Sequence, residues 1–90
     1  MSKFENQCVV VTGGASGIGE ATVRAIINEG GSVLIADLQE ERGQALVSEL
    51  GSRAAFHFTD VTREDDIVGA IGLAQNEFGP LTGMVNNAGV

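Results

Sequence analysis

The segment that most constrains this chain is a glycine-rich loop, which reads Thr12-Gly13-Gly14-Ala15-Ser16-Gly17-Ile18-Gly19. It follows the β-branched run Cys8–Thr12 and opens a helical pattern. A phosphate reaches backbone N–H groups closely only where no Cβ holds it off, and a helix N-terminus adds free N–H groups and about half a positive charge. We therefore expect Gly13 to turn the chain and Gly17 to leave room for a pyrophosphate. Gly19 should let the helix pack closely on the sheet.

The spacing of the loop is G-x-x-x-G-x-G, which differs from the G-x-G-x-x-G of many dinucleotide-binding loops. No G-x-x-x-x-G-K-[ST] occurs and no lysine lies near the loop, so a P-loop NTPase is not expected. Taken alone, the loop could also be a plain glycine-rich turn.

Asp37 favours the phosphate-binding interpretation. It follows the apolar run Ser32–Ala36 and lies 18 residues after the last glycine of the loop. An acidic residue about 20 residues beyond such a loop is placed to bind the adenosine ribose. Its carboxylate would repel a 2′-phosphate by about 4 kcal/mol at about 4 Å and an effective dielectric of about 20. Ala15, Ser16 and Leu38 supply no compensating cation, so NAD is predicted over NADP. An aspartate that caps the next helix is the alternative.

Four apolar runs alternate with three helical patterns. The predicted strands are 8–12, 32–36, 54–59 and 83–86, and the predicted helices are about 18–29, 39–50 and 62–78. Continuous rather than alternating apolarity is typical of strands buried on both faces. This order predicts right-handed crossovers and a parallel sheet with helices on both faces.

Each helical pattern has an expected apolar face. These faces comprise Ile18, Ala21, Thr22 and Ala25, widened by Ile26 and Ile27, in the first helix; Leu46, Val47 and Leu50 in the second; and Ile67, Ile71, Ala74 and Phe78 in the third. Thr62 and Asp65 have the spacing of a capping box for the third helix. Gly30, Gly51 and Gly79 are expected to end the three helices.

Composition excludes several classes of protein. With 90 residues, 43% hydrophobic and 19% charged, the chain is expected to form one folded unit rather than a disordered segment. A net charge of −7 leaves no basic face for nucleic acid. No apolar run approaches a membrane span, and the first residues do not resemble a secretory signal. A cytoplasmic protein is therefore expected.

The remaining reactive side chains have structural interpretations. Cys8 cannot form an internal disulfide because it is the only cysteine, and a buried thiol is expected. His57 lies between two phenylalanines and is interpreted as a strand residue. With no second histidine, no metal site is predicted. The acidic residues of the run 63–66 are expected to complement the dipole of the third helix.

The sequence resembles the short-chain dehydrogenase/reductase family along its whole length. The resemblance rests on the glycine loop, Asp37, the pair Asp60-Val61 and the run Asn86-Asn87-Ala88-Gly89. It implies a three-layer Rossmann-type α/β fold with a doubly wound parallel sheet. This chain would be the N-terminal half of that fold, with strand order 3-2-1-4.

The resemblance also implies which residues contact NAD. Asp60 would bond the adenine amino group beside the backbone of Val61, although a strand-end cap before Thr62 is an alternative role. The run Asn86-Asn87-Ala88-Gly89 would end the fourth strand, line the adenosine side and brace the central sheet, although the Asn pair could instead be a simple turn. The expected cofactor-binding residues are Thr12, Gly13, Ser16, Gly17, Ile18, Gly19, Asp37, Leu38, Asp60, Val61, Asn87, Ala88 and Gly89.

One departure from the family is large. Family members use a later Ser and a Tyr-x-x-x-Lys pair for proton transfer, whereas this chain has no tyrosine and its only lysine is Lys3. No catalytic residue is therefore assigned. Residues 1–90 are interpreted as a partial NAD(P)-binding domain that is inactive alone. An alcohol or carbonyl substrate would bind only in a longer parent chain.

Two other functions are compatible with the sequence. One is a module that binds NAD or another adenine nucleotide without chemistry. The other is an interaction fragment, because a fourth strand with a free edge can pair with another chain. Self-association, as a homo-oligomer, is expected.

Overall fold

The computed structural model describes residues 7–15 and 17–87, which form one parallel sheet with three helices. The elements are β1 (Cys8–Thr12), α1 (Gly17–Asn28), β2 (Ser32–Asp37), α2 (Glu40–Leu50), β3 (Ala54–Phe58), α3 (Glu64–Phe78) and β4 (Gly83–Asn86). The strand order is β3-β2-β1-β4, and every pair is parallel. The predicted fold class and strand order are confirmed.

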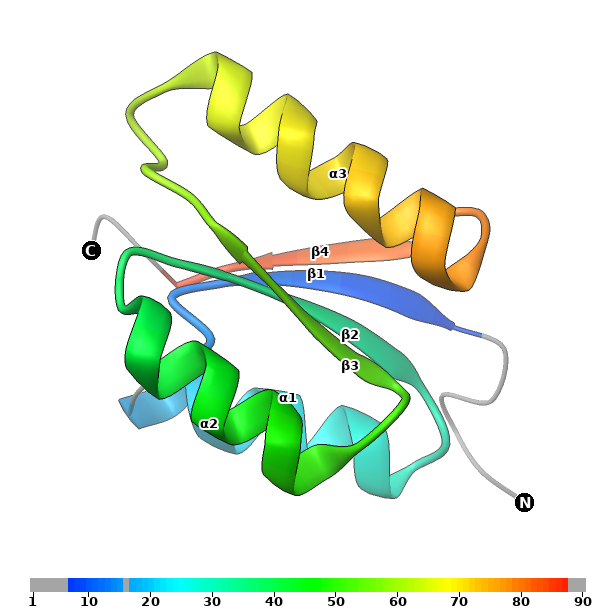
Figure 1. Cartoon of the computed structure of the whole chain (residues 1–90). Helices are drawn as coiled ribbons and strands as arrows, with labels where there is room; N and C mark the ends of the chain where they lie inside the picture. The colour runs from blue at the N-terminus through cyan, green and yellow to red at the C-terminus, as the bar shows by residue number, and fades with distance from the viewer. Residues whose placement is uncertain (1–6, 16, 88–90) are drawn as a thin grey trace.

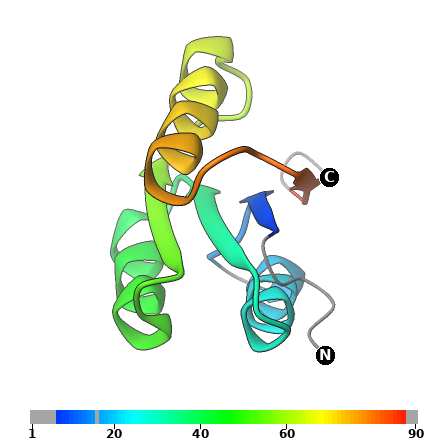
Figure 2. The same cartoon turned by 90° about the vertical axis from the view of Figure 1, so that its right-hand side faces the viewer.

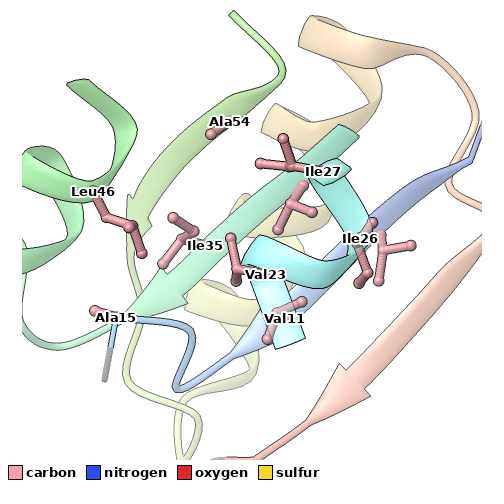
Figure 3. Packing of buried hydrophobic residues seen from close by; sticks show 10 residues of the cluster. Val11, Ala15, Val23, Ile26, Ile27, Ile35, Leu46 and Ala54 are labelled. Carbon is pink, nitrogen blue, oxygen red and sulfur yellow. The ribbon is translucent and has the colours of Figure 1, made fainter. Parts of the chain in front are cut away.

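The helices lie on both faces of the sheet (Figure 1). Figure 2 shows α1 and α2 together on one side and α3 on the other. Side chains of β1 and β2 alternate between two cores. Val11 and Ile35 pack towards α1 and α2 (Figure 3), whereas Val10 and Leu34 pack towards α3. Both central strands are therefore covered on both faces, as their continuous apolarity predicts.

The face that α1 buries differs from the predicted one. The buried residues are Gly19, Val23, Ile26 and Ile27, spaced i, i+4, i+7 and i+8. Ile18 is 78% exposed. Of the predicted face, only Ile26 and Ile27 are buried. The rotation of the helix is set at its first turn, where Gly19 lies against the loop backbone.

Part of the predicted face of α1 lies near the fourth strand, whereas Ile18 and Ala21 are exposed. Thr22 and Ala25 border an open groove of about 480 Å³ that Met84 and Val85 line from β4. In the described part of the chain, β4 pairs only with β1, so its outer edge carries no strand.

The second helix buries the face that its sequence predicts. Leu46 is buried, and Val47 and Leu50 pack against the same core. Gly43 brings this helix close to β3, because a Cβ at position 43 would overlap the ring of Phe56. The second helix therefore packs on β3 at a distance that only a glycine at position 43 permits.

The third helix buries smaller residues than expected. Ala74 and Ala70 are its buried residues, and Phe78 packs beside them. Ile67 and Ile71 are only half-buried. None of the helices in the described residues combines the length and the apolarity needed to cross a membrane.

The expected helix ends are confirmed. Gly30, Gly51 and Gly79 follow the three helices with φ angles of 93°, 90° and 100°. These angles lie in the region that a residue without a Cβ adopts most easily.

Cys8 is buried at the start of the central strand β1, as predicted. It is 3% exposed, and its Sγ lies 3.8 Å from the carbonyl oxygen of Ala74 on α3. Desolvation raises the pKa of its thiol above the ordinary value. The thiol is therefore structural and weakly reactive in the folded chain.

Candidate functional site

The glycine loop turns sharply at the end of β1. Gly13 has a φ of 67°, and its N–H donates to the carbonyl oxygen of Ala36 at 2.8 Å. Gly17 opens α1 with a φ of 57°. A Cβ at Gly17 would meet no protein atom within 4 Å. A side chain at Gly17 would thus meet open space, and the start of α1 here carries the N–H groups of a helix N-terminus.

Gly19 has a different neighbour from the one expected. A Cβ at this position would overlap the carbonyl oxygen of Gly13 and lie 2.9 Å from the Cα of Gly14. Its close approach is therefore to the loop, not to the face of the sheet. The loop and the first turn of α1 are packed as one unit.

Asp37 holds the loop to the end of β2. Its side chain is nearly buried, and the residue is 8% exposed. Oδ2 accepts from the N–H of Ala15 at 3.0 Å, and Oδ1 accepts from the N–H of Gln39 at 3.0 Å. The N-cap of α2 is Gln39, so Asp37 precedes the helix and does not cap it. Each carboxylate oxygen has a second lone pair, which leaves Asp37 able to accept from a ligand hydroxyl.

Asp60 is held by the turn that follows β3. Its Oδ1 accepts from the hydroxyl of Thr62 at 2.6 Å and from the N–H of Thr62 at 2.9 Å. The hydroxyl and then the amide of Thr62 hold the pKa of the Asp60 carboxyl below its usual value. The group therefore stays ionised and can accept from an amino group.

The predicted capping box of α3 is wrong by one residue. The helix has Arg63 as its N-cap, without a side-chain hydrogen bond there. Thr62 bonds Asp60 instead, and Asp66 reaches back to accept from the N–H of Asp60 at 3.0 Å. The acidic side chain at N3 thus fixes the strand end rather than the cap, and Asp65 takes no part in it.

A cleft of about 200 Å³ joins these groups at the carboxyl ends of β2 and β3. The residues that line the cleft are Gly13, Ala36, Asp37, Leu38, Thr59, Asp60, Val61 and Thr62. Of these, Leu38 is 57% exposed. A mainly apolar cleft that is flanked by two carboxylates suits a planar base with donor groups at its edge.

The ends of β1 and β4 are joined through Thr12. Its hydroxyl, in a residue only 1% exposed, donates to Oδ1 of Asn86 at 2.8 Å and accepts from the N–H of Asn87 at 3.0 Å. The Nδ2 of Asn87 is buried and has no hydrogen-bond partner in the described part of the chain. A buried donor without a partner is uncommon in proteins and is accounted for if a ligand accepts from it.

The structure thus brings five of the expected residues to one edge of the sheet: Gly13, Asp37, Leu38, Asp60 and Val61 all line the cleft. Thr12 and Gly19 do not line the cleft. Thr12 connects the ends of β1 and β4, and Gly19 packs against the backbone of the glycine loop. Three expected residues, Ser16, Ala88 and Gly89, lie outside the described residues.

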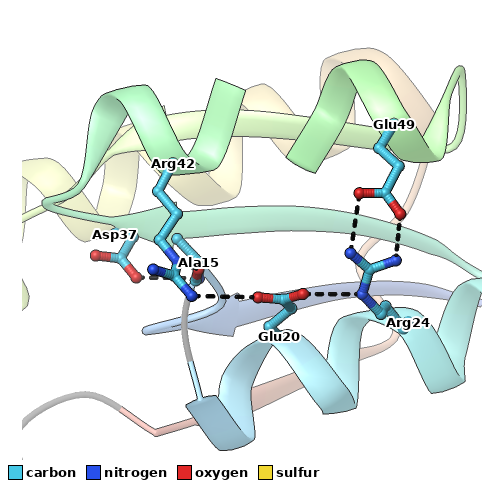
Figure 4. A network of polar contacts seen from close by, with 6 residues as sticks. All are labelled: Ala15, Glu20, Arg24, Asp37, Arg42 and Glu49. Atoms are coloured by element: carbon cyan, nitrogen blue, oxygen red, sulfur yellow. Dashed lines mark hydrogen bonds and ion pairs between the residues drawn. The ribbon is translucent and has the colours of Figure 1, made fainter. Parts of the chain in front are cut away.

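Arg42 is a neighbour of the loop that the sequence did not reveal. It lies in the first turn of α2, and its Nε donates to the carbonyl oxygen of Ala15 at 2.6 Å (Figure 4). An exposed arginine in an acidic helix gives no sequence signal for such a contact, because only the packing of α2 beside the loop creates it.

Comparison with known proteins gives consistent matches. A family profile described as short chain dehydrogenase matches residues 7–90. Momilactone A synthase from Oryza sativa subsp. japonica is 46% identical over 89 residues, which cover 98% of this chain and 32% of that protein. The 3-hydroxyacyl-CoA dehydrogenase type-2 of Drosophila melanogaster is 42% identical over 86 residues, which cover 96% of this chain and 34% of that protein.

A solved structure agrees with both the fold and the sequence. The crystal structure of 3-hydroxyacyl-CoA dehydrogenase type-2 from Mycobacterium avium matches with a TM-score of 0.89 and 48% identity, over 97% of this chain and 34% of that one. The chain therefore spans about a third of the length of these relatives. The family profile matches residues 7–90, and the fold agrees with that of the solved relative. This chain therefore belongs to the short-chain dehydrogenase family.

Proposed function

We propose that the chain is the dinucleotide-binding portion of an NAD-dependent short-chain oxidoreductase, which transfers hydride between NAD(H) and an alcohol or carbonyl substrate. The observation that carries this proposal is the cleft beside Gly13, with the Asp37 and Asp60 carboxylates at its border. NAD, when bound, supplies the hydride acceptor. The residues of this chain bind and orient its adenosine and pyrophosphate.

Each group of the site has a proposed role. The open backbone at Gly17 and the N-terminus of α1 bind the pyrophosphate. Asp37 accepts from the ribose hydroxyls, and Asp60 accepts from the adenine amino group. The unpartnered Nδ2 of Asn87 donates to the cofactor.

The same geometry supports NAD over NADP. A 2′-phosphate would lie beside Asp37, whose charge is held in place by two backbone N–H groups. Arg42 is close, but its guanidinium is engaged by the Ala15 carbonyl oxygen and lies 3.6 Å from Glu20. After screening by salt, we expect NAD to bind at least about tenfold more tightly than NADP.

Titration calorimetry on the 90-residue chain tests the proposal. We expect heat of binding with NAD and with ADP and a much weaker signal with NADP. In Asp37→Asn the amide has one oxygen for the two backbone N–H groups of Ala15 and Gln39, so one donor loses its acceptor and overall affinity falls. The ratio of NAD to NADP affinity approaches one because the charge is gone. Absence of heat with both NAD and ADP would refute cofactor binding, and equal affinities for NAD and NADP would refute the role of Asp37.

A second candidate function is association through β4. The strand has one neighbour among the described residues, and Met84 is 44% exposed on it. Pairing of two β4 edges would satisfy the unpaired backbone groups. Sedimentation velocity at several concentrations tests this function: a concentration-dependent dimer supports it, and a monomer throughout removes it.

A further inference from the structure

The backbone of Ala15, in the middle of the glycine loop, is held on both its N–H and its carbonyl side. Its N–H donates to Oδ2 of Asp37 at 3.0 Å, and its carbonyl oxygen accepts from Nε of Arg42 at 2.6 Å. Figure 4 shows Asp37 and Arg42 beside this residue. Ala15 itself is fully buried. A loop that must present its backbone to a ligand is thus fixed at its centre by two charged side chains.

Arg42 also connects the loop to the first helix. Its terminal nitrogen lies 3.6 Å from Oε1 of Glu20 on α1, and the other oxygen of Glu20 accepts from Arg24 at 2.9 Å. Glu20 therefore keeps the guanidinium of Arg42 oriented while its Nε points to the loop. The side chain of Arg42 is 57% exposed, so the contact does not depend on its burial.

Arg24 provides an internal comparison, because it joins the same two helices through side-chain carboxylates. It pairs with Glu20 on α1 and bidentately with Glu49 on α2, at 2.6 and 3.0 Å. If the arginines served only to join α1 to α2, Arg24 would be the more important of the two. Only Arg42 donates to the loop backbone among the contacts of the described residues.

We propose that Arg42 is a positioning residue for dinucleotide binding. Arg42 holds the carbonyl group of Ala15 while Asp37 holds its N–H, so the two contacts together restrict φ and ψ of Ala15 and keep the pyrophosphate loop beside the ribose carboxylate. This inference rests on the proposed function. Arg42 itself touches the loop and not the cofactor.

The experiment compares Arg42→Met with Arg24→Met in the 90-residue chain. Both changes keep an unbranched stem and remove one charge from the same helix pair. We expect Arg42→Met to lower ADP affinity about tenfold, the factor that corresponds to one charge-assisted hydrogen bond of about 1.4 kcal/mol. Arg24→Met should change ADP affinity less than about twofold. Arg42→Lys, which retains a donor and the charge, should recover part of the loss.

A second measurement needs no ligand. Amide hydrogen exchange at Ala15 reports whether its N–H stays bonded to Asp37. We expect exchange there to accelerate in Arg42→Met and to stay at the native rate in Arg24→Met. Melting curves by circular dichroism give the stability of each variant for comparison.

The outcomes separate the two proposals. If the native chain binds neither ADP nor NAD, the proposed function fails, and the exchange rate of Ala15 still decides whether Arg42 holds the loop. If Arg42→Met and Arg24→Met have the same ADP affinity and the same Ala15 exchange, Arg42 merely joins the helices and the inference is overturned.

Discussion

Three glycines of this chain allow a matched test of how its backbone is used. A Cβ at Gly72 of α3 would meet no atom within 4 Å, and the same holds for Gly17, but only Gly17 has a positive φ, at 57°. A Cβ at Gly19 would overlap the carbonyl oxygen of Gly13. The three positions thus represent an ordinary helical glycine, a left-handed glycine with open space, and a glycine in close contact.

The expected changes in the free energy of unfolding differ in sign and size. Gly72→Ala should stabilise the chain by about 1 kcal/mol, because alanine is the better helix former. Gly17→Ala should destabilise it by about 1–2 kcal/mol, the cost of a left-handed residue with a Cβ. Gly19→Ala should cost about 3 kcal/mol or more, since backbone must move to accommodate the methyl group.

Urea unfolding followed by circular dichroism measures these energies, because the chain has no Trp or Tyr for fluorescence. ADP titration separates binding from stability. Gly17→Ala should lose affinity although it still folds, because its methyl group occupies the open side of the loop. Gly72→Ala should bind normally. If Gly17→Ala is as stable as Gly72→Ala, the left-handed conformation is not required there. A Gly19→Ala chain of native stability would contradict the close contact.

Three further expectations follow from contacts away from the loop. Gly43→Ala should destabilise the chain by about 1–3 kcal/mol, and a Phe56→Leu background should reduce that cost; additive effects in thermal melts would argue against the overlap with the ring. Thr12→Val should cost about 1–2 kcal/mol through its lost hydrogen bonds, whereas Thr12→Ser should retain the β1–β4 connection; urea melts in which Thr12→Ser loses stability and Thr12→Val does not would assign the effect to the methyl group. Arg24 lowers the pKa of Glu49, so this pair stabilises the chain above the ordinary glutamate pKa of about 4.3 and loses that effect as the pH falls through the lowered value. The free energy of unfolding of Glu49→Gln should therefore fall less than that of the native chain between about pH 6 and pH 3. Equal losses in the two chains over this range would contradict this sign.

The arrangement of the strands could be predicted from the sequence because it depends on local patterns. The two central strands, β1 and β2, are continuous apolar runs, and the predicted strands 8–12 and 83–86 agree with β1 and β4 to the residue. The ends of the helices could be predicted for the same reason, since a glycine with positive φ marks each of them.

The rotation of α1 could not be predicted in the same way. Counting apolar residues from Ile18 selects a face with several small side chains, whereas the helix buries a face that begins at Gly19, which lies in close contact with Gly13. Periodicity describes one helix by itself, whereas its orientation depends on a neighbouring loop.

The site shows the same division. Asp37 ends β2 and Asp60 follows β3, so their places at the sheet edge could be predicted from position alone. That Asp37 binds the N–H of Ala15, and that Asp66 holds Asp60, depends on turns whose geometry the sequence does not specify. The role of Arg42 depends on packing between two segments 27 residues apart.

Labelling of the Cys8 thiol can measure how often the folded chain opens transiently. Its thiol is the only one in the sequence and is 3% exposed in a central strand between β2 and β4. A thiol-specific reagent can react with it only when that strand separates from α3. The labelling rate, divided by the rate for an exposed cysteine, therefore gives the equilibrium constant for opening of the sheet centre. A cofactor that bridges the strand ends should slow this labelling in proportion to its occupancy.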